Sequence, residues 1–405
     1  MPHFTSVEFN NETGQTLAGR LHLPFGPFRG AALFAHCFTC SKDITAARQI
    51  AEGLSRSGIA VLRFDFTGLA QSEGDFAATG FHTNLSDLRA AAAFMASQSF
   101  GKHSLAPQLL IRHSLGGAAV LAAAPDIASV TGIATIGAPA EPGHVLHLVE
   151  AEIDTILATG RGLVNIGGRP FEIGAGFVQD LQARLSVDYI KRLSHDLLVL
   201  HAPRDNIVGI ENAATIFTAA KHPKSFISLD RADHLLSAAE DRQFAADMIA
   251  AWARRCLGQR SEIERASEGE VDVITSSDGD FAQDILAGEH SLRADEPVSV
   301  PGGLDSGPTP YDFLLAGLGA CTAMTLKLYA RRKKWPLEHV AVQLNHAKIH
   351  QQDCAADGRL DKMTRQIEMT GPLDDSQKQQ LMQIADKCPV HKTLAAGVKV
   401  ETVSR

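Results

Sequence analysis

The sequence predicts a two-domain protein, an α/β domain followed by a smaller α+β domain. Its 405 residues exceed what one hydrophobic core usually organises. Up to about residue 258, apolar β-rich runs alternate with helical patterns, whereas beyond residue 270 the candidate strands come before and after two helices. The segment LGQRSEIERASEGEV (257–271) is charged and lacks an apolar period, as linkers do. We therefore expect domains at 1–258 and 271–405, joined by a linker at 259–270.

The N-terminal pattern is typical of a mostly parallel sheet with helices on both faces. Six β-rich runs mostly carry continuous apolar stretches instead of a strict alternation with polar residues, which indicates strands that are buried on both sides. They cover residues 30–36, 59–66, 108–114, 130–138, 195–202 and 224–230. Apolar residues recur at helical spacing over 42–57 and 83–98, so these segments are expected to be crossover helices.

Residues 140–194 interrupt this alternation because they are too long for a simple crossover. Within them, 145–158 has a helical pattern, and GLVNIGGRPFEI (162–173) is typical of a hairpin. An insertion at this point is placed to form a small lid over the ends of the strands.

Composition and charge exclude several classes of protein. A formal net charge of −8 argues against a nucleic-acid binder, and the one basic cluster, ARRKKW (330–335), follows an apolar helical run and is interpreted as a solvated helix end. We find no run of about 18 apolar residues that predicts a membrane span, and the N-terminus lacks the pattern of a signal peptide. Six cysteines are too few for a disulfide framework, so we expect a cytoplasmic protein with free thiols.

A serine lies where the third apolar run meets a helix, in LLIRHSLGGAAVL (109–121). Small residues after Ser114 let the helix turn away close to the strand, which exposes Oγ at the carboxyl edge of the sheet. Asp205 and His234 follow the fifth and sixth runs, in the order serine, acid, histidine. An imidazole can take the proton of the serine hydroxyl, and a carboxylate can orient the imidazole.

Each of these residues also has a simpler interpretation. Alone, Ser114 would be a helix N-cap or turn residue, and Asp205 a loop cap. Asp230 and Asp233 are rival acids, although their closeness to His234 in the sequence favours a turn or supporting role.

Five segments together resemble an α/β hydrolase over the first two-thirds of the chain. They are HCFTC (36–40), RFDFTGLAQSEGDF (63–76), HSLGG (113–117), PRDNIV (203–208) and DH (233–234). The resemblance implies a serine hydrolase that cleaves carboxylic esters with Ser114, Asp205 and His234. The N–H groups of Phe38 and Leu115 would form the oxyanion hole.

Arg112 departs from the family pattern, which has a small residue two positions before the serine. The hypothesis that follows is a retained fold with slow or restricted ester turnover, or an impaired domain that serves only as a binding module. Cys37 and Cys40 form a C-x-x-C pair, but no second pair or helix start accompanies them. Small buried thiols in the oxyanion segment are the favoured interpretation.

The C-terminal part resembles the osmotically inducible protein C (OsmC) family over nearly all of 271–405. The resemblance lies in residues 288–340, which contain the apolar helical run 310–334, and in ADKCPVHKTL (385–394), which overlaps the end of a second expected helix at 374–388. It implies an intertwined homodimer and a thiol peroxidase that reduces organic hydroperoxides, with Cys321 as the peroxidatic and Cys388 as the resolving cysteine.

Peroxide attack requires a thiolate, which a nearby arginine favours, and the sulfenic acid formed then condenses with a second thiol. The resemblance assigns the arginine to Arg293 and the acid that holds it to Asp312. Asp312 and Cys321 are nine residues apart, about 13 Å along a helix and on opposite faces, so the acid must act through the arginine, a bend at Gly317 or Gly319, or a partner subunit.

Alternatives remain for the cysteines. Cys321 shares one helical stripe with Leu314 and Leu328, where free cysteine is usually a small core residue. In that case the C-terminal domain would be a dimerising scaffold without turnover. Cys256 and Cys354 are interpreted as bystanders.

The sequence indicates no cofactor and no metal, since it has no His/Cys cluster at zinc spacing and no phosphate-binding glycine loop. Together, the two resemblances predict a bifunctional protein with small-molecule ester and hydroperoxide substrates.

Overall fold

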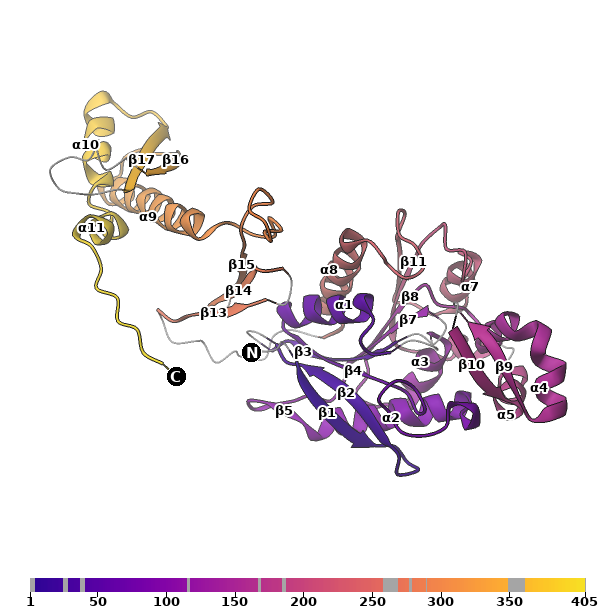
Figure 1. Ribbon diagram of the computed structural model, residues 1–405. Helices are drawn as coiled ribbons and strands as arrows, with labels where there is room; N and C mark the ends of the chain where they lie inside the picture. Colours follow the sequence, from indigo (N-terminus) through magenta and orange to yellow (C-terminus); the bar gives the residue numbers. More distant parts are fainter. Residues whose placement is uncertain are drawn as a thin grey trace. The chain divides into compact units, whose positions relative to one another are not determined.

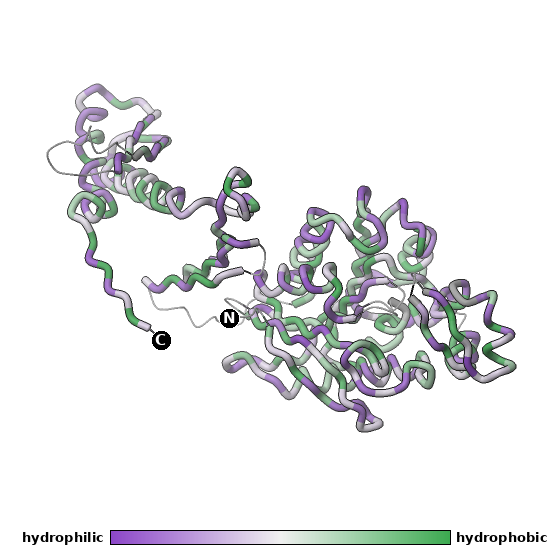
Figure 2. Tube along the Cα trace, viewed as in Figure 1, coloured by the Kyte–Doolittle hydropathy of each residue, from purple (hydrophilic) through white to green (hydrophobic). Residues whose placement is uncertain are grey.

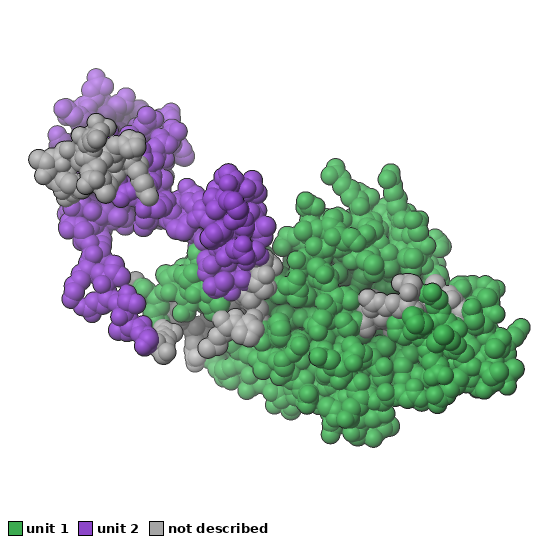
Figure 3. All heavy atoms as spheres, in the orientation of Figure 1, with its two compact units in different colours: residues 1–274, 284–291 green, residues 275–283, 292–405 purple. Residues whose placement is uncertain are grey.

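The computed structural model describes most of the chain and divides it into two compact units (Figure 3). One unit contains residues 1–274 and 284–291, and the other contains 275–283 and 292–405. The described residues are 4–24, 28–36, 41–114, 117–166, 169–183, 187–257, 269–276, 279–288, 290–348 and 361–404. The predicted linker lies mostly outside them, and the domain limits stay a prediction.

The first unit is built on an eight-stranded sheet in the order β1-β2-β4-β3-β7-β8-β11-β12 (Figure 1). Its strands are β1 Thr5–Asn10, β2 Thr16–His22, β3 Gly30–Ala35, β4 Ile59–Phe64, β7 Leu109–His113, β8 Gly132–Ile136, β11 Asp196–His201 and β12 Lys224–Ser228. The pairs from β4 to β12 are parallel, and β1 and β2 add antiparallel strands at one edge. The mostly parallel sheet confirms the predicted fold class. All six predicted strands are present.

Helices cover both faces of this sheet. The helices are α1 Thr45–Arg56, α2 Phe81–Ser97, α3 Gly117–Ala123, α7 Glu211–Ala219 and α8 Ala239–Cys256, with short 3-10 turns at Phe76–Ala78 and Ala124–Asp126. One buried cluster joins α1 and α8 to the sheet, and another joins α2, α3 and α7 to it. Leu110 of β7 belongs to one cluster and Ile111 to the other. Such strands are apolar at every position because neighbouring side chains point to opposite, equally buried faces.

The segment between β8 and β11 forms a small substructure of its own. It consists of a 3-10 segment Pro142–Glu152, α4 Ile153–Thr159, β9 Arg161–Ile166, β10 Arg169–Gly174, α5 Ala175–Gln182 and α6 Asp188–Lys191. β9 and β10 pair antiparallel, as the hairpin prediction required. A second short ribbon, β5 Ser99–Phe100 with β6 His103–Ser104, lies after α2.

The second unit centres on one long helix. Its elements are α9 Pro310–Lys333, β16 His339–Lys348, β17 Asp361–Thr370, α10 Asp375–Ala385 and α11 Pro389–Ala396. A three-stranded sheet of β13 Val271–Thr275, β14 Gln283–Ala287 and β15 His290–Ala294 lies where the division between the units falls. α10 ends at Ala385, three residues before the predicted end, because Pro389 opens a separate helix.

α9 differs from the buried stripe that its sequence suggested. Among the described residues it is the one helix long and apolar enough to cross a membrane by length and composition, and Figure 2 shows green, apolar segments along it. It packs instead on β16, α10 and α11. Its buried residues are Leu318, Gly319, Thr322, Leu326 and Ala330. The expectation that Leu314 and Leu328 lie in a core is wrong, because both are exposed.

Candidate active sites

Ser114 lies at a sharp bend directly after β7. Its backbone φ of +64° is in the left-handed region, which residues other than glycine rarely adopt. The bend reverses the chain from β7 into α3 at the carboxyl edge of the parallel strands, the edge where such sheets bind ligands. Ser114 is buried at this bend.

The structure brings Ser114, His234 and Asp205 into one hydrogen-bonded chain. Ser114 Oγ lies 2.6 Å from His234 Nε2, and His234 Nδ1 lies 2.7 Å from Asp205 Oδ2. Asp205 follows β11 and His234 follows β12, so strand ends distant in sequence supply the three groups. The rival acids bond elsewhere: Asp230 accepts from the Ser228 hydroxyl, and Asp233 accepts from Ser237 N–H at 2.8 Å.

Backbone groups hold the Asp205 carboxylate. Its Oδ1 accepts hydrogen bonds from Ile207 N and Val208 N, both at 2.9 Å. Burial raises the pKa of Asp205, but hydrogen bonds from His234 and these N–H groups outweigh it and bring the pKa below its ordinary value. The carboxylate therefore stays ionised beside the imidazole.

Gly137 is a supporting residue that sequence reasoning missed. It follows β8 with a φ of +55°. A Cβ there would lie 3.2 Å from Asp205 Oδ2 and 3.4 Å from His234 Nδ1. Gly137 is the penultimate residue of the run 130–138, so its position at a strand end was the available signal.

His113 is a second residue that sequence reasoning missed. Its ring is fully buried behind His234, and its Nε2 lies 2.6 Å from the His234 backbone oxygen. Burial lowers the pKa of His113 to about 4, so the neutral ring donates Nε2–H to that carbonyl. This contact fixes the backbone that carries the imidazole. No sequence motif could reveal the contact between His113 and His234, since these residues are far apart in sequence.

Arg112 points to the other face of the sheet from His113, as neighbouring strand residues do. Its guanidinium carbon lies 5.0 Å from the centre of the Phe66 ring. The side chain is buried, and burial lowers the pKa of Arg112 to about 9. Among the residues that the structure describes, its Nε and Nη1 have no hydrogen-bond partner. The arginine stacks on Phe66 while Ser114 and His234 remain in contact, and its effect on turnover stays a hypothesis.

The predicted oxyanion donors Phe38 and Leu115, together with Cys37 and Cys40, lie outside the described residues. Asp65, directly after β4, joins the two residues that flank the segment 37–41. Its Oδ1 lies 3.6 Å from His36 Nε2 and accepts from Lys42 N at 2.6 Å, while Oδ2 accepts from Lys42 Nζ at 2.6 Å.

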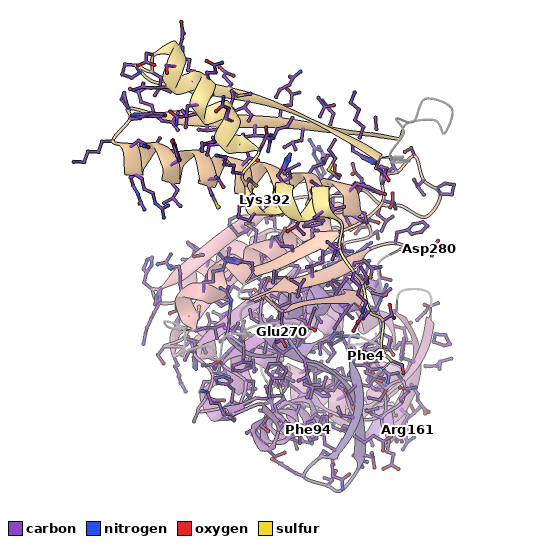
Figure 4. All side chains as sticks on the ribbon, turned by 90° about the vertical axis from the view of Figure 1, so that its left-hand side faces the viewer. Phe4, Phe94, Arg161, Glu270, Asp280 and Lys392 are labelled. Carbon is purple, nitrogen blue, oxygen red and sulfur yellow. The ribbon has the colours of Figure 1, made fainter. Side chains whose placement is uncertain are left out.

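The second candidate site is a pair of thiols in the C-terminal unit. Cys321 lies within α9, and Cys388 is the N-cap of α11, which packs on α9. Figure 4 shows the two helices side by side, with Lys392 labelled on α11. The two thiols are free, and each shifts the pKa of the other, so they lie near each other. Cys321 is half-buried, and Cys388 is buried.

The two thiols differ in acidity. Burial raises the pKa of Cys388, but hydrogen bonds from Cys321 and from backbone N–H groups at the start of α11 outweigh it, and the pKa falls below its ordinary value. Burial and the hydrogen bond to Cys388 raise the pKa of Cys321. Cys256, by contrast, has a pKa raised to about 12 by burial and by Asp196. Cys354 lies outside the described residues.

Arg293 and Asp312 are hydrogen-bonded to residues other than Cys321 in the structure. Arg293 is on β15, and its Nε donates to Ser306 Oγ at 2.8 Å. Asp312 closes the first turn of α9, where it accepts from Thr309 N at 2.9 Å. Their part in activating Cys321 stays a prediction. Within the described ranges, no cluster of three His, Cys, Asp or Glu side chains could hold a metal ion.

Comparisons with known proteins divide the chain in the same way. The family described as "Serine aminopeptidase, S33" matches residues 28–159, and the family described as "OsmC-like protein" matches 303–403. The esterase domain of a Rhodothermus marinus protein is a solved structure with 48% identity and a TM-score of 0.52, and the alignment covers 63% of this chain and 99% of that one.

Other solved structures share the fold at lower identity. The α/β hydrolase GrgF from Penicillium sp. sh18 has 18% identity and a TM-score of 0.51, over 64% of this chain and 99% of that one. Est1E from Butyrivibrio proteoclasticus with bound ferulic acid has 17% identity and a TM-score of 0.50, over 62% and 100%. No curated protein matches the chain significantly.

Proposed function

The chain is a fusion of an α/β hydrolase domain with an OsmC-family domain, and from this premise we propose two catalytic activities. The first is hydrolysis of carboxylic esters by Ser114, His234 and Asp205. The observation that carries it is the pair of short contacts, 2.6 Å from Ser114 Oγ to His234 Nε2 and 2.7 Å from His234 Nδ1 to Asp205 Oδ2. The 48% identity to an esterase domain supports esters as the substrate class.

In the proposed reaction His234 takes the Ser114 proton as Oγ attacks the ester carbonyl, and the ionised Asp205 stabilises the imidazolium. The N–H groups of Phe38 and Leu115 would bind the developing oxyanion. His234 then returns the proton to the departing alkoxide, which leaves an acyl group on Ser114. Water, deprotonated by the same imidazole, releases the acid and restores the serine.

Covalent labelling tests this activity at its nucleophile. A fluorophosphonate probe is expected to add one adduct mass to the intact protein, and Ser114→Ala is expected to abolish the adduct. Hydrolysis of a p-nitrophenyl ester should disappear in the same variant. Absence of labelling in the folded wild-type protein would favour the alternative of an impaired hydrolase domain that acts as a binding module.

Arg112→Gly separates the two versions of this proposal. If the buried arginine slows the site, the variant should hydrolyse the ester faster than the wild-type protein. Equal, fast rates would contradict any impairment by Arg112.

The second proposed activity is reduction of organic hydroperoxides by Cys321 and Cys388. The Cys321 thiolate attacks the hydroperoxide oxygen, the O–O bond breaks, and an alcohol leaves after taking a proton. The sulfenic acid on Cys321 then loses water as Cys388 attacks it and a disulfide forms. A dithiol reductant returns both cysteines to the thiol state. The observation that carries this proposal is the closeness of the two thiols, which lie on helices that pack on each other and shift each other's pKa.

Non-reducing peptide mapping tests the thiol reaction. After one equivalent of cumene hydroperoxide, a Cys321–Cys388 disulfide is expected in wild-type protein and in the control Cys256→Ser. Cys321→Ser should consume no hydroperoxide. If the wild-type protein forms no disulfide, the alternative of a dimerising scaffold without turnover gains support.

We further propose that the protein is a cytoplasmic homodimer. The supporting observation is the apolar surface that α9 leaves open, where Leu314 is 47% and Met324 is 72% exposed. Val400 and Val403, after α11, are more than 80% exposed. Large apolar side chains left exposed in this unit are consistent with a protein interface, and the family resemblance makes a second copy the partner. Light scattering coupled to size exclusion should give twice the mass of the chain.

A further inference from the structure

One charged residue stands on the apolar side of β17. In this strand, half-buried and exposed positions alternate, and the half-buried ones are Met363, Arg365, Ile367 and Met369. Three are apolar, and Ile367 and Met369 pack on the core of the unit. The Arg365 side chain is only 12% exposed. A guanidinium this far from water is costly unless its N–H groups find acceptors.

Arg365 finds these acceptors on two other elements. Its Nη1 donates to Thr322 Oγ1 at 2.8 Å and to Ala385 O at 3.2 Å, and its Nη2 donates to Asp386 Oδ1 at 2.8 Å. Thr322 is on α9, Ala385 ends α10, and Asp386 is in the turn that leads to α11. One planar guanidinium therefore ties β17 to α9 and to the end of α10.

A cysteine lies close in sequence to each point of contact, within α9 in one case and just after the end of α10 in the other. Thr322 directly follows Cys321. Ala385 O also accepts the N–H of Cys388, at 3.4 Å, so Arg365 and Cys388 share one carbonyl. As the last residue of α10, Ala385 has a carbonyl without an intrahelical partner, which a guanidinium can satisfy. The turn that places Cys388 at the start of α11 is thereby fixed.

The contact with Thr322 extends to the thiol pair itself. The Thr322 hydroxyl is fully buried and donates to Leu318 O at 2.7 Å, so its oxygen accepts from Arg365. The same hydroxyl lowers the pKa of the Cys388 thiol, so it lies near that sulfur. Arg365 and Thr322 thus form a polar path that leads to Cys388 inside an apolar unit.

We propose that Arg365 is a positioning residue of the thiol pair, holding Cys388 against Cys321 so that disulfide formation is faster than a second oxidation. The inference rests on the proposed peroxidase chemistry. In the favoured step, the Cys388 thiolate attacks the Cys321 sulfenic sulfur, the S–S bond forms, the S–O bond breaks, and hydroxide leaves as water. In the competing step, a second hydroperoxide transfers oxygen to the sulfenic sulfur, which gives sulfinic acid and another alcohol.

The test compares Arg365→Met and Arg365→Lys with the wild-type protein and with Arg332→Met, a control at an exposed position on α9. After addition of excess cumene hydroperoxide, mass spectrometry measures disulfide against sulfinic acid at Cys321. A misplacement of about 1 Å can slow a reaction on the order of a hundredfold. We expect disulfide formation to slow roughly ten- to a hundredfold in Arg365→Met. The first consumption of hydroperoxide should stay within about twofold of wild type.

Lysine keeps the charge but cannot form the same fork of hydrogen bonds, so Arg365→Lys should restore disulfide formation only in part. Thr322→Val removes one arm of the path while Arg365 remains, and it should shift the products toward sulfinic acid in the same direction. This variant keeps the test decisive if Arg365→Met does not fold.

Diamide oxidation distinguishes this inference from the proposed function, since diamide joins thiols without hydroperoxide. If wild-type protein forms the disulfide with diamide but not with hydroperoxide, the peroxidase proposal fails, and the positioning role is read from the diamide rates alone. Equal diamide rates in folded Arg365→Met, Thr322→Val and wild-type protein would overturn the inference.

Discussion

Ser114 has the backbone conformation that a nucleophile needs at a strand-to-helix bend, and that conformation is unfavourable for serine. A φ of +64° costs a residue with a Cβ about 1 kcal/mol relative to glycine. The hydrogen-bonded chain to His234 and Asp205, and the packing of β7 and α3, must offset that cost. Function and stability therefore pull in opposite directions at this residue.

A pair of variants measures this strain. Ser114→Gly should unfold at higher urea concentration than Ser114→Ala, with a difference of about 1 kcal/mol in the free energy of unfolding. Both lack the nucleophile and should fail to react with the phosphonate probe. Equal stabilities would show that the bend is unstrained.

Gly137 can be tested against a glycine with the same backbone strain. Gly137 and Gly101 have φ of +55° and +57°, but a Cβ meets Asp205 and His234 only at Gly137, and nothing within 4 Å at Gly101. Alanine at either position should cost about 1 kcal/mol of stability. Only Gly137→Ala should also lower kcat/KM for ester hydrolysis. An equal loss of kcat/KM in Gly101→Ala would point to a global effect instead.

His113 predicts a dependence of stability on pH. Its folded pKa is about 4, below the ordinary value of 6.5, so the unfolded state takes up the proton first as the pH falls. The stability contributed by neutral His113 is complete above pH 6.5 and lost as the pH falls toward 4. The size of the loss is about 3 kcal/mol.

His113→Gln does not titrate and should show no such loss. The free energy of unfolding of wild-type protein minus that of the variant should therefore fall by about 3 kcal/mol between pH 7 and pH 4. Parallel curves for the two proteins would mean that His113 is not buried in its neutral form.

At the scale of single elements, α11 adds to the effect of Cys321 in lowering the pKa of Cys388. Cys388 caps the start of this helix, where backbone N–H groups favour negative charge on the sulfur. In Cys321→Ser, alkylation of Cys388 by iodoacetamide should follow a thiolate with a pKa below 9, and it should decline as the pH falls through that value. Cys256 supplies the contrast, because its pKa of about 12 predicts slow alkylation at pH 8. Comparable rates at both cysteines would contradict this assignment.

Elements with a strong local signal could be predicted from sequence, and those defined by distant contacts could not. β3, β4 and β7 are mostly apolar and buried at every position, and they were identified to within a residue or two. β1 was not predicted, because most of its residues are exposed on an antiparallel edge. The long second helix was predicted through Cys388, although Pro389 begins a new helix there.

The candidate sites divide in the same way. Ser114, Asp205, His234, Cys321 and Cys388 each follow a strand or lie on a helix with a recognisable pattern, so the sequence could nominate them. His113, Gly137 and Arg365 act on residues many positions away, through a carbonyl, a close approach and a shared helix end. A single sequence contains no record of those contacts.

At the scale of the whole molecule, the fusion places two kinds of proposed nucleophile on one chain. The triad and the thiol pair lie in separate units and share no described residue. We expect Ser114→Ala to abolish ester hydrolysis while hydroperoxide reduction stays within about twofold, and Cys321→Ser to do the reverse, since sites without shared residues act independently. Both rates are measured on separate substrates.

Processing of a peroxidised ester tests whether the two sites cooperate. If both variants process it as fast as wild-type protein, coupling between the domains is excluded. Accumulation of a free hydroperoxide acid in Cys321→Ser would indicate that hydrolysis comes first.

Three consecutive residues at the end of β7 have three separate tasks: Arg112 stacks on Phe66 on one side, His113 braces His234 on the other, and Ser114 makes the bend. Side chains in a strand alternate strictly between its two sides. Deleting or inserting one residue upstream would therefore turn Arg112 to the side of the sheet that holds His234, and His113 to the side that holds Phe66. A single substitution in this strand leaves the other residues on their sides of the sheet, whereas a one-residue insertion or deletion moves all three to the opposite side.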